Sequence, residues 1–168
     1  MDAIAILGWI AATRAQTGKK VEVILFGHSI GAGVASFAAA SNTSSDLKII
    51  GLILETPFTS VADMLRILYP RRWLPYYYLT PFLRSSWDLR QYLSQIARQP
   101  QRPRIMIVQA ESDEIVNKEM APEIKDIAVR NKFTVDFFTV RGALHFECMG
   151  HGGFPEWVSV FVANCMNR

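Results

Sequence analysis

The amino-acid sequence predicts an α/β fold, with a mainly parallel sheet flanked by helices. Short apolar runs rich in β-branched residues recur along the 168 residues, segments with helical spacing separate them, and 50% of all residues are hydrophobic. Apolar runs of about four to eight residues are typical of buried strands, and strands that alternate with helices form parallel sheets covered on both faces. The length of the chain suits one globular domain with its own core.

Strands and helices are expected to alternate along most of the chain. Buried strands are expected at residues 21–26, 47–54, 104–110 and 133–140. Helices are expected near the start of the chain, where Ile4, Leu7 and Ile10 recur at helical spacing, and at residues 30–40, 118–132 and 155–168. Pro122 must lie in the first turn of its helix or split that helix, and Pro155 suits the start of the last helix.

Residues 57–103 interrupt this alternation and are expected to form a cap-like insertion within a single domain of residues 1–168. The segment carries six of the eight prolines, which is typical of short helices and turns outside a sheet. Between Pro57 and Arg104 lie eight of the twelve arginines, all five tyrosines and no lysine, with two aspartates as the acids. Eight arginines less two aspartates give this segment a formal charge of +6, within a net charge of +3 for the whole chain.

Composition argues against several other classes of protein. No run of about 18 apolar residues is present to cross a bilayer. The start of the chain carries Asp2 and no basic leader, so a signal peptide is not expected. Cys148 and Cys165 have no CxxC or Cys/His pattern, which predicts two free thiols and neither a disulfide scaffold nor a metal site.

The pentapeptide Gly-His-Ser-Ile-Gly at residues 27–31 fits the pattern G-x-S-x-G. Chance alone produces such a match in about one chain in twenty of this length, so the position of the motif matters more than its letters. It lies where a strand ends at Phe26 and a helix of small residues begins. A sharp strand-to-helix turn exposes a serine, needs glycines at Gly27 and Gly31, and presents backbone N–H groups to a developing oxyanion. Ser29 is the candidate nucleophile, and a serine in an ordinary glycine-rich turn is the alternative.

A nucleophilic serine needs a base, and the chain has three histidines. His28 is next to the serine, but the turn should point its side chain elsewhere. His145 lies five residues beyond the fourth expected strand, on a loop from which an imidazole can reach the serine. His145 is therefore the candidate base, and His151, nearer the last helix, is the alternative.

The third group should be a carboxylate that orients the imidazole and stabilises its cation. The acidic segment Glu-Ser-Asp-Glu at residues 111–114 follows the third expected strand directly. Asp113 is the candidate acid, and Glu111 and Glu114 on the same loop are alternatives. Ser29, Asp113 and His145 then each lie just past the end of a strand, in the order nucleophile, acid and base.

Four motifs, spread along nearly the whole chain, are similar to motifs of one protein superfamily. The segments "GHSIGAGVASFAA", "ETPFTS", "ESDEIV" and "GALHFE" are similar to the nucleophile elbow, a post-strand loop, the acid loop and the histidine loop of the α/β-hydrolase superfamily. Within it, the chain resembles compact eukaryotic serine hydrolases related to bud-emergence and abhydrolase-domain proteins. The resemblance implies hydrolysis through an acyl-serine, without metal or organic cofactor. It assigns Ser29 as nucleophile, Asp113 as acid, His145 as base and the Ile30 N–H as an oxyanion donor.

The N-terminal part of the chain differs from the members of that superfamily. Only about 20 residues precede the nucleophile strand, and they are similar to the helix that normally enters it, whereas family members carry several earlier strands. No HGG-type motif, which supplies the second oxyanion donor, precedes the nucleophile strand, and the HGG run at residues 151–153 lies near the last expected helix instead. The chain is thus expected to be the C-terminal portion of a hydrolase. We expect an unpaired edge on the nucleophile strand and, for the missing donor, a rate lower by about 10²- to 10³-fold.

The resemblance also bears on substrates and partners. In this fold a segment such as residues 57–103 commonly forms a cap over the active site, so it is expected to help select an acyl or lipid-like substrate. Arginine and aromatic side chains suit an anionic membrane surface, which is an expected partner, whereas no motif for nucleic acid is present. The expected function is hydrolysis of an ester or thioester of lipid, lysophospholipid or acyl-protein type. The alternatives are a non-catalytic binding or scaffolding module and a serine peptidase acting on small amides.

Overall fold

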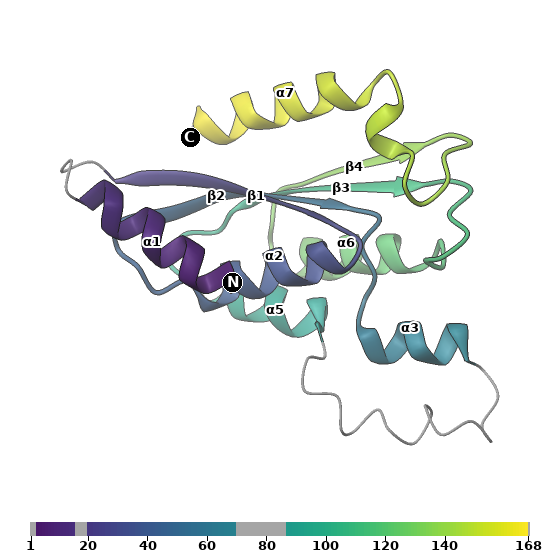
Figure 1. Cartoon of the computed structure of the whole chain (residues 1–168), viewed down its shortest axis with the longest axis horizontal. Helices are drawn as coiled ribbons and strands as arrows, with labels where there is room; N and C mark the ends of the chain where they lie inside the picture. Colours follow the sequence, from purple (N-terminus) through teal and green to yellow (C-terminus); the bar gives the residue numbers. More distant parts are fainter. Residues whose placement is uncertain (1–2, 16–19, 70–86, 168) are drawn as a thin grey trace.

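The computed structural model describes residues 3–15, 20–69 and 87–167, and at its centre is one sheet of four parallel strands (Figure 1). The strands lie side by side in chain order: β1 (Val21–His28), β2 (Leu47–Glu55), β3 (Arg104–Ala110) and β4 (Val135–Val140). Each strand lies within two residues of the bounds expected from the sequence. The predicted parallel α/β sheet is confirmed.

Helices cover both faces of this sheet, as Figure 1 shows. One face carries α1 (Ala3–Ala15), α2 (Ile30–Ser41), α5 (Leu89–Ile96) and α6 (Met120–Arg130), and the other carries α7 (Phe154–Met166). Consecutive strand residues alternate between the two cores, so that Ile107 packs on the α2 side and Met106 on the α7 side. Pro122 and Pro155 lie in the first turns of α6 and α7, where the sequence allows them.

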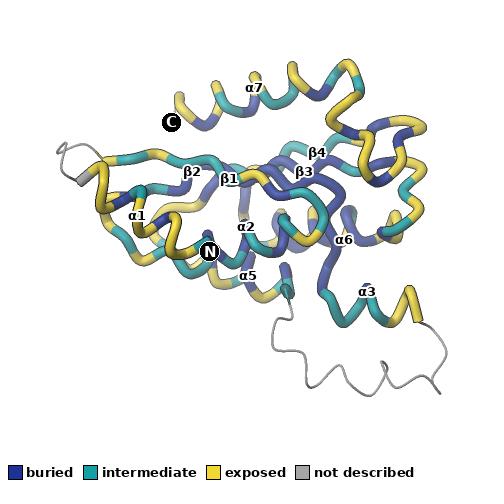
Figure 2. The backbone as a smooth tube through the Cα atoms, in the orientation of Figure 1, coloured by how far each residue is buried: buried dark blue, intermediate teal, exposed yellow. Residues whose placement is uncertain are grey.

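The two outer strands of the described sheet are less buried than the sequence predicts. The segments at 21–26 and 133–140 are apolar enough to suggest buried strands, yet Phe26 is 45% exposed, Glu22 is exposed and β4 is mostly half-buried. An outer strand has a neighbour along only one side, so more of its surface reaches solvent (Figure 2). The central strands β2 and β3 are buried along almost their whole length.

Two helices of the expected insertion are described, α3 (Val61–Leu68) and α5. α5 packs beside α2 in the main core, where Leu89 and Leu93 are fully buried. α3 lies away from the sheet (Figure 1), and an ion pair of 2.7 Å between Asp63 and Arg90 joins it to the start of α5. Residues 70–86, the central part of the expected cap, hold three of the tyrosines and three of the arginines and lie outside the described residues.

Neither a disulfide nor a membrane-spanning helix contributes to the part of the chain that the structure describes. Cys148 and Cys165 are both buried on the α7 side of the sheet, and neither forms a disulfide within the described residues. None of the described helices is both long enough and apolar enough to cross a bilayer.

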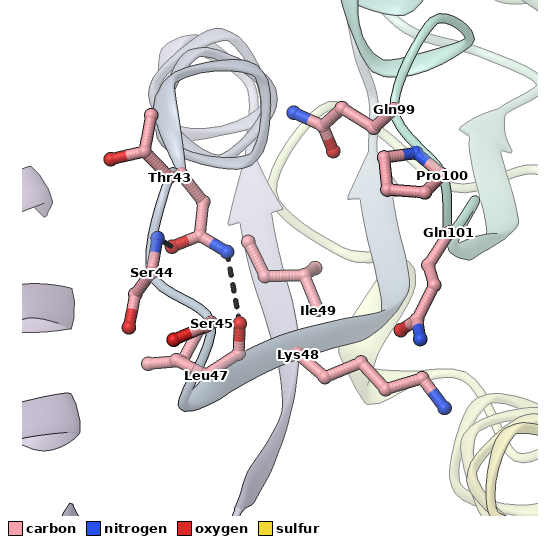
Figure 3. A pocket seen from close by; sticks show the side chains of 10 residues that line it. Thr43, Ser44, Ser45, Leu47, Lys48, Ile49, Gln99, Pro100 and Gln101 are labelled. Carbon is pink, nitrogen blue, oxygen red and sulfur yellow. Dashed lines mark hydrogen bonds between the residues drawn. The ribbon is translucent and has the colours of Figure 1, made fainter.

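A polar cavity of about 360 Å³ opens at the amino end of the sheet, opposite the edge where the strands finish (Figure 3). Its lining comes from the turn between α2 and β2 and from the segment before β3. Asn42 donates from Nδ2 to the Leu47 carbonyl at 3.0 Å, and Gln99 donates to the Ala39 carbonyl at 3.0 Å. These amides fasten the turn to the end of α2, so the polar groups of the cavity serve the fold.

Candidate active site

Side chains capable of catalysis gather at the carboxyl edge of the sheet. His28 ends β1 and Ser29 follows it, while Glu55 ends β2. The acid loop (residues 111–116) follows β3, and the histidine loop (residues 141–150) follows β4. Parallel strands all finish at the same edge, which is where ligands bind in open α/β sheets. Four separate stretches of sequence therefore meet at one place.

Ser29 occupies a sharp turn between β1 and α2. Its φ of 52° and ψ of −117° are rare for any residue but glycine, and holding such a conformation costs about 1–3 kcal/mol. The Ser29 N–H donates to the Glu55 carbonyl at 2.9 Å, which fastens the turn to the end of β2. A Cβ on Gly27 would collide with the backbone of Gly31 and lie 2.6 Å from the Ala32 nitrogen. The turn therefore needs glycine at position 27 and holds the serine half-buried at the edge of the sheet.

The two glycines of the motif differ, which corrects the expectation that both are required. A Cβ added at Gly31 meets nothing within 4 Å in the described ranges. We expect Gly27→Ala to lower the free energy of unfolding by more than about 3 kcal/mol, because the clash is with backbone that cannot move aside. Gly31→Ala, in the first turn of α2, should change it by less than about 1 kcal/mol. Urea unfolding of both variants measures the difference, and equal losses would contradict this geometry.

Asp113 and His145 form a buried pair. The Nδ1 atom of His145 lies 2.9 Å from Oδ2 of Asp113 and 3.0 Å from Oδ1, and the two side chains are 2% and 5% exposed respectively. Oδ1 of Asp113 also accepts the N–H groups of Ile115 and Val116, at 2.9 and 2.7 Å. An ionised carboxylate can only accept, so the hydrogen must lie on Nδ1. The pair thereby leaves Nε2 of His145 as the nitrogen that can act as a base.

The two alternative acids bind backbone groups of the histidine loop instead of an imidazole. Oε2 of Glu111 accepts the N–H of Gly142 at 2.9 Å, and Oε2 of Glu114 accepts the N–H of His145 at 3.0 Å. The geometry therefore favours Asp113 as the partner of the imidazole, and the glutamates hold the loop that carries it.

His28 also reaches this site, although the sequence suggested that its side chain would point elsewhere. Its Nε2 lies 3.1 Å from the carbonyl oxygen of His145, and the two ring centroids are 4.9 Å apart. Within the described ranges, no hydrogen bond joins the Ser29 hydroxyl to His145, and the hydrogen bond to the histidine loop comes from His28, the residue before the serine. His151, the alternative base, uses only main-chain hydrogen bonds in those ranges and pairs with no carboxylate there.

Glu55 is a second residue of the site that the sequence reasoning missed. Its side chain is 1% exposed, and it lies opposite His28 in the register of β1 and β2. Burial raises the pKa of its carboxyl, while the charge of His28, the Met149 backbone N–H and the charge of His145 act in the opposite direction. The sequence does contain the signal, because a carboxylate follows the continuous apolar run of residues 49–54.

Cys148 is the other potential nucleophile at this edge of the sheet. It begins the 3₁₀ turn Cys148–Gly150 and is fully buried. Burial, together with the charges of Glu55 and Asp113, raises the pKa of its thiol to about 12. Since the thiolate is the reactive form, this cysteine stays unreactive and Ser29 is the candidate nucleophile.

The first turn of α2 supplies a hydrogen-bond donor beside the serine. Ile30 is the first residue of α2, and the N–H groups of a first helical turn have no partner within the helix. The positive end of the helix dipole lies at the same place. The Ile30 N–H can therefore stabilise negative charge that develops next to Ser29.

Comparisons with solved structures identify the fold. The Pyrococcus furiosus esterase Pf2001 matches with a TM-score of 0.62 at 18% identity, over 98% of this chain and 59% of the esterase. A monoacylglycerol lipase of Paleococcus ferrophilus matches with a TM-score of 0.54 at 16% identity, over 99% of this chain and 76% of the lipase. The chain has the α/β-hydrolase fold. This confirms the resemblance that the sequence motifs predict.

Similarity at the level of sequence covers part of this chain. Protein bem46 of Schizosaccharomyces pombe is 30% identical over 97 residues, which are 58% of this chain and 29% of bem46. No protein-family model matches the sequence. The chain spans less than two thirds of bem46 and of the Pyrococcus esterase.

Proposed function

We propose that this chain is a serine hydrolase that cleaves an ester or thioester through an acyl intermediate on Ser29. The observation that carries the proposal is the buried Asp113–His145 pair at the same sheet edge as the strained Ser29. An acid–imidazole pair beside a serine on a strand-to-helix turn provides the groups needed for base-assisted acyl transfer.

In the proposed reaction, Oγ of Ser29 attacks the substrate carbonyl carbon while Nε2 of His145 takes the hydroxyl proton. Asp113 accepts the hydrogen bond from Nδ1–H and stabilises the imidazolium that forms. The tetrahedral intermediate then collapses, the bond to the leaving oxygen or sulfur breaks, and the leaving group takes the proton from Nε2. A water molecule, deprotonated by His145, attacks the acyl-serine and releases the carboxylic acid together with free Ser29.

The Ile30 N–H stabilises the oxyanion in both steps. It is the only donor that we assign, because no HGG-type motif precedes the nucleophile strand to supply a second one, and the HGG run at residues 151–153 lies beyond the histidine loop. Loss of one oxyanion donor lowers kcat by about 10²- to 10³-fold, so the chain should turn over more slowly than a hydrolase with two donors by about that factor.

Apolar side chains around the site support an acyl or lipid-like substrate. Ile30, Leu144, Phe146 and Met149 are large, apolar and exposed beside Ser29 and His145, and Phe146 is 73% exposed. An acyl chain that covers them gains from the removal of apolar surface from water. The solved structures with this fold include esterases and a monoacylglycerol lipase, which agrees with such a substrate.

The part of the insertion that precedes α5 completes the proposal as a cap over this site, since α5 itself packs in the main core. The arginines and tyrosines of that part suit contact with an anionic membrane surface, whereas Arg104 lies in β3 and pairs with Asp136. Vesicle binding that is independent of anionic lipid content and of salt would contradict the membrane contact.

A fluorophosphonate probe tests the proposed function directly. The probe should label the folded chain once, and digestion followed by mass spectrometry should place the adduct on the peptide that contains Ser29. Absence of labelling in a chain that unfolds cooperatively would favour the non-catalytic binding module. A series of p-nitrophenyl esters, an acyl thioester and an anilide then separates esterase from peptidase, and we expect turnover of the first two.

A further inference from the structure

We propose that His28 is a positioning residue that couples the nucleophile strand to the histidine loop and so sets the place of His145 relative to Ser29. The inference rests on the proposed function. It concerns a side chain that takes no part in the bond-making steps described above.

The contact of His28 with the loop is specific. Nε2 of His28 lies 3.1 Å from the carbonyl oxygen of His145. A carbonyl only accepts, so Nε2 carries the hydrogen and donates it. The His28 ring also packs edge-on against the His145 ring at 4.9 Å and tilted against Phe146 at 5.2 Å, while Phe146 is edge-on to His145 at 4.8 Å. Three rings thus contact one another directly beside the nucleophile.

The histidine loop is otherwise tied to the acid loop. Ser112 donates its N–H to the Ala143 carbonyl at 3.0 Å, and the carboxylates of Glu111, Asp113 and Glu114 bind groups of residues 142–145. Among the described residues, the His28 bond is the one hydrogen bond between β1 and the histidine loop. Without it, the histidine loop keeps its bonds to the acid loop and the link from the Met149 N–H to Glu55 at the end of β2, but it loses its direct hydrogen bond to β1, the strand that leads to Ser29.

A small shift of the histidine loop matters because proton transfer requires the base within hydrogen-bonding distance of the hydroxyl. A displacement of about 1 Å can lower a catalysed rate by about 10²-fold. His28 is the residue immediately before Ser29. Its hydrogen bond to the histidine loop therefore fixes the position of that loop relative to the nucleophile. Loss of this bond should lower kcat much more than it changes KM, because proton transfer requires hydrogen-bonding distance, whereas apolar contacts between the loop and an acyl chain tolerate a small shift.

Two replacements of His28 separate the hydrogen bond from the ring. His28→Phe keeps a ring of similar size and removes the donor, whereas His28→Gln places an amide Nε2 the same number of bonds from the backbone as the imidazole Nε2. We expect His28→Phe to lower kcat by about 10- to 100-fold with KM within about twofold, and His28→Gln to stay within about threefold of the parent chain. The rate constant for fluorophosphonate labelling should fall by the same factor as kcat.

The control is His151→Phe, since that histidine has no side-chain hydrogen bond in the described ranges. It should leave kcat, KM and the labelling rate unchanged. Equal losses in His28→Phe and His28→Gln, a loss expressed in KM instead of kcat, or a His28→Phe variant as reactive as the parent chain would each overturn the positioning role. A parent chain that the probe never labels overturns the proposed function instead, so the two failures are distinguishable.

Discussion

Replacing Ser29 by alanine is expected to lower kcat for ester hydrolysis by about 10⁶-fold, leaving only the rate that substrate binding and the oxyanion donor supply. The variant keeps the buried Asp113–His145 pair but has no oxygen that can form the acyl intermediate. It should also lose all fluorophosphonate labelling. Hydrolysis of a p-nitrophenyl ester, followed by absorbance at high protein concentration, measures the residual rate.

Two further serine variants test this prediction against a control and against the effect of backbone strain. Ser112→Ala alters an exposed serine on the acid loop whose backbone N–H bond to Ala143 survives the change, and it should keep full activity. Ser29→Gly should be as inactive as Ser29→Ala but more stable by about 1 kcal/mol, because glycine adopts a φ of 52° without strain. If Ser29→Ala retained substantial turnover, another nucleophile would be acting and the acyl-serine proposal would be wrong.

The sheet could be predicted because the apolar runs are long and consistent. Residues 105–108 of β3 are all fully buried, and such a run has no favourable place outside a covered sheet. The missing earlier strands predict an open edge at β1, but they do not predict which side chains that edge exposes. The segment at 21–26 has the composition of a buried strand, and only the arrangement of neighbouring strands leaves Phe26 in contact with solvent.

The sequence predicts where the site lies better than it predicts which side chains contact one another there. The rule that loops after parallel strands meet at one edge singles out Ser29, the acid loop and the histidine loop. It does not choose among three carboxylates within four residues. The backbone of the acid loop makes that choice, since the N–H groups of Ile115 and Val116 hold Asp113 facing the imidazole.

The contact between His28 and His145 lies beyond what the sequence can predict. The two residues are 117 positions apart, and the direction of a side chain at the end of a strand depends on the neighbouring loop. Glu55 is different, because its place after an apolar strand already marks it as a residue of the carboxyl edge. The rule that residues at the ends of parallel strands meet at one edge, applied to β2 as well, predicts Glu55 as a residue of the site.

Asp113→Asn is expected to lower kcat by about 10⁴-fold while the fold and KM are retained. The reason lies in how the carboxylate is held. Oδ1 accepts the N–H groups of Ile115 and Val116, so an asparagine in this place must keep its carbonyl oxygen there. Its NH₂ group then faces Nδ1 of His145 and forces that nitrogen to accept. The ring hydrogen moves to Nε2, which can no longer take the proton of Ser29.

Matched variants on the same loop test this explanation. Glu111→Gln and Glu114→Gln remove charge from neighbours that bind only the backbone of the histidine loop, and each should lower kcat by no more than about tenfold. ¹⁵N chemical shifts of the His145 ring at neutral pH should report the hydrogen on Nδ1 in the parent chain and on Nε2 in Asp113→Asn. An unchanged tautomer, or a larger loss of kcat in Glu111→Gln or Glu114→Gln than in Asp113→Asn, would show that the imidazole depends on a different acid. Because the charge change is identical in the three variants, only the position of the carboxylate relative to the imidazole can separate their rates.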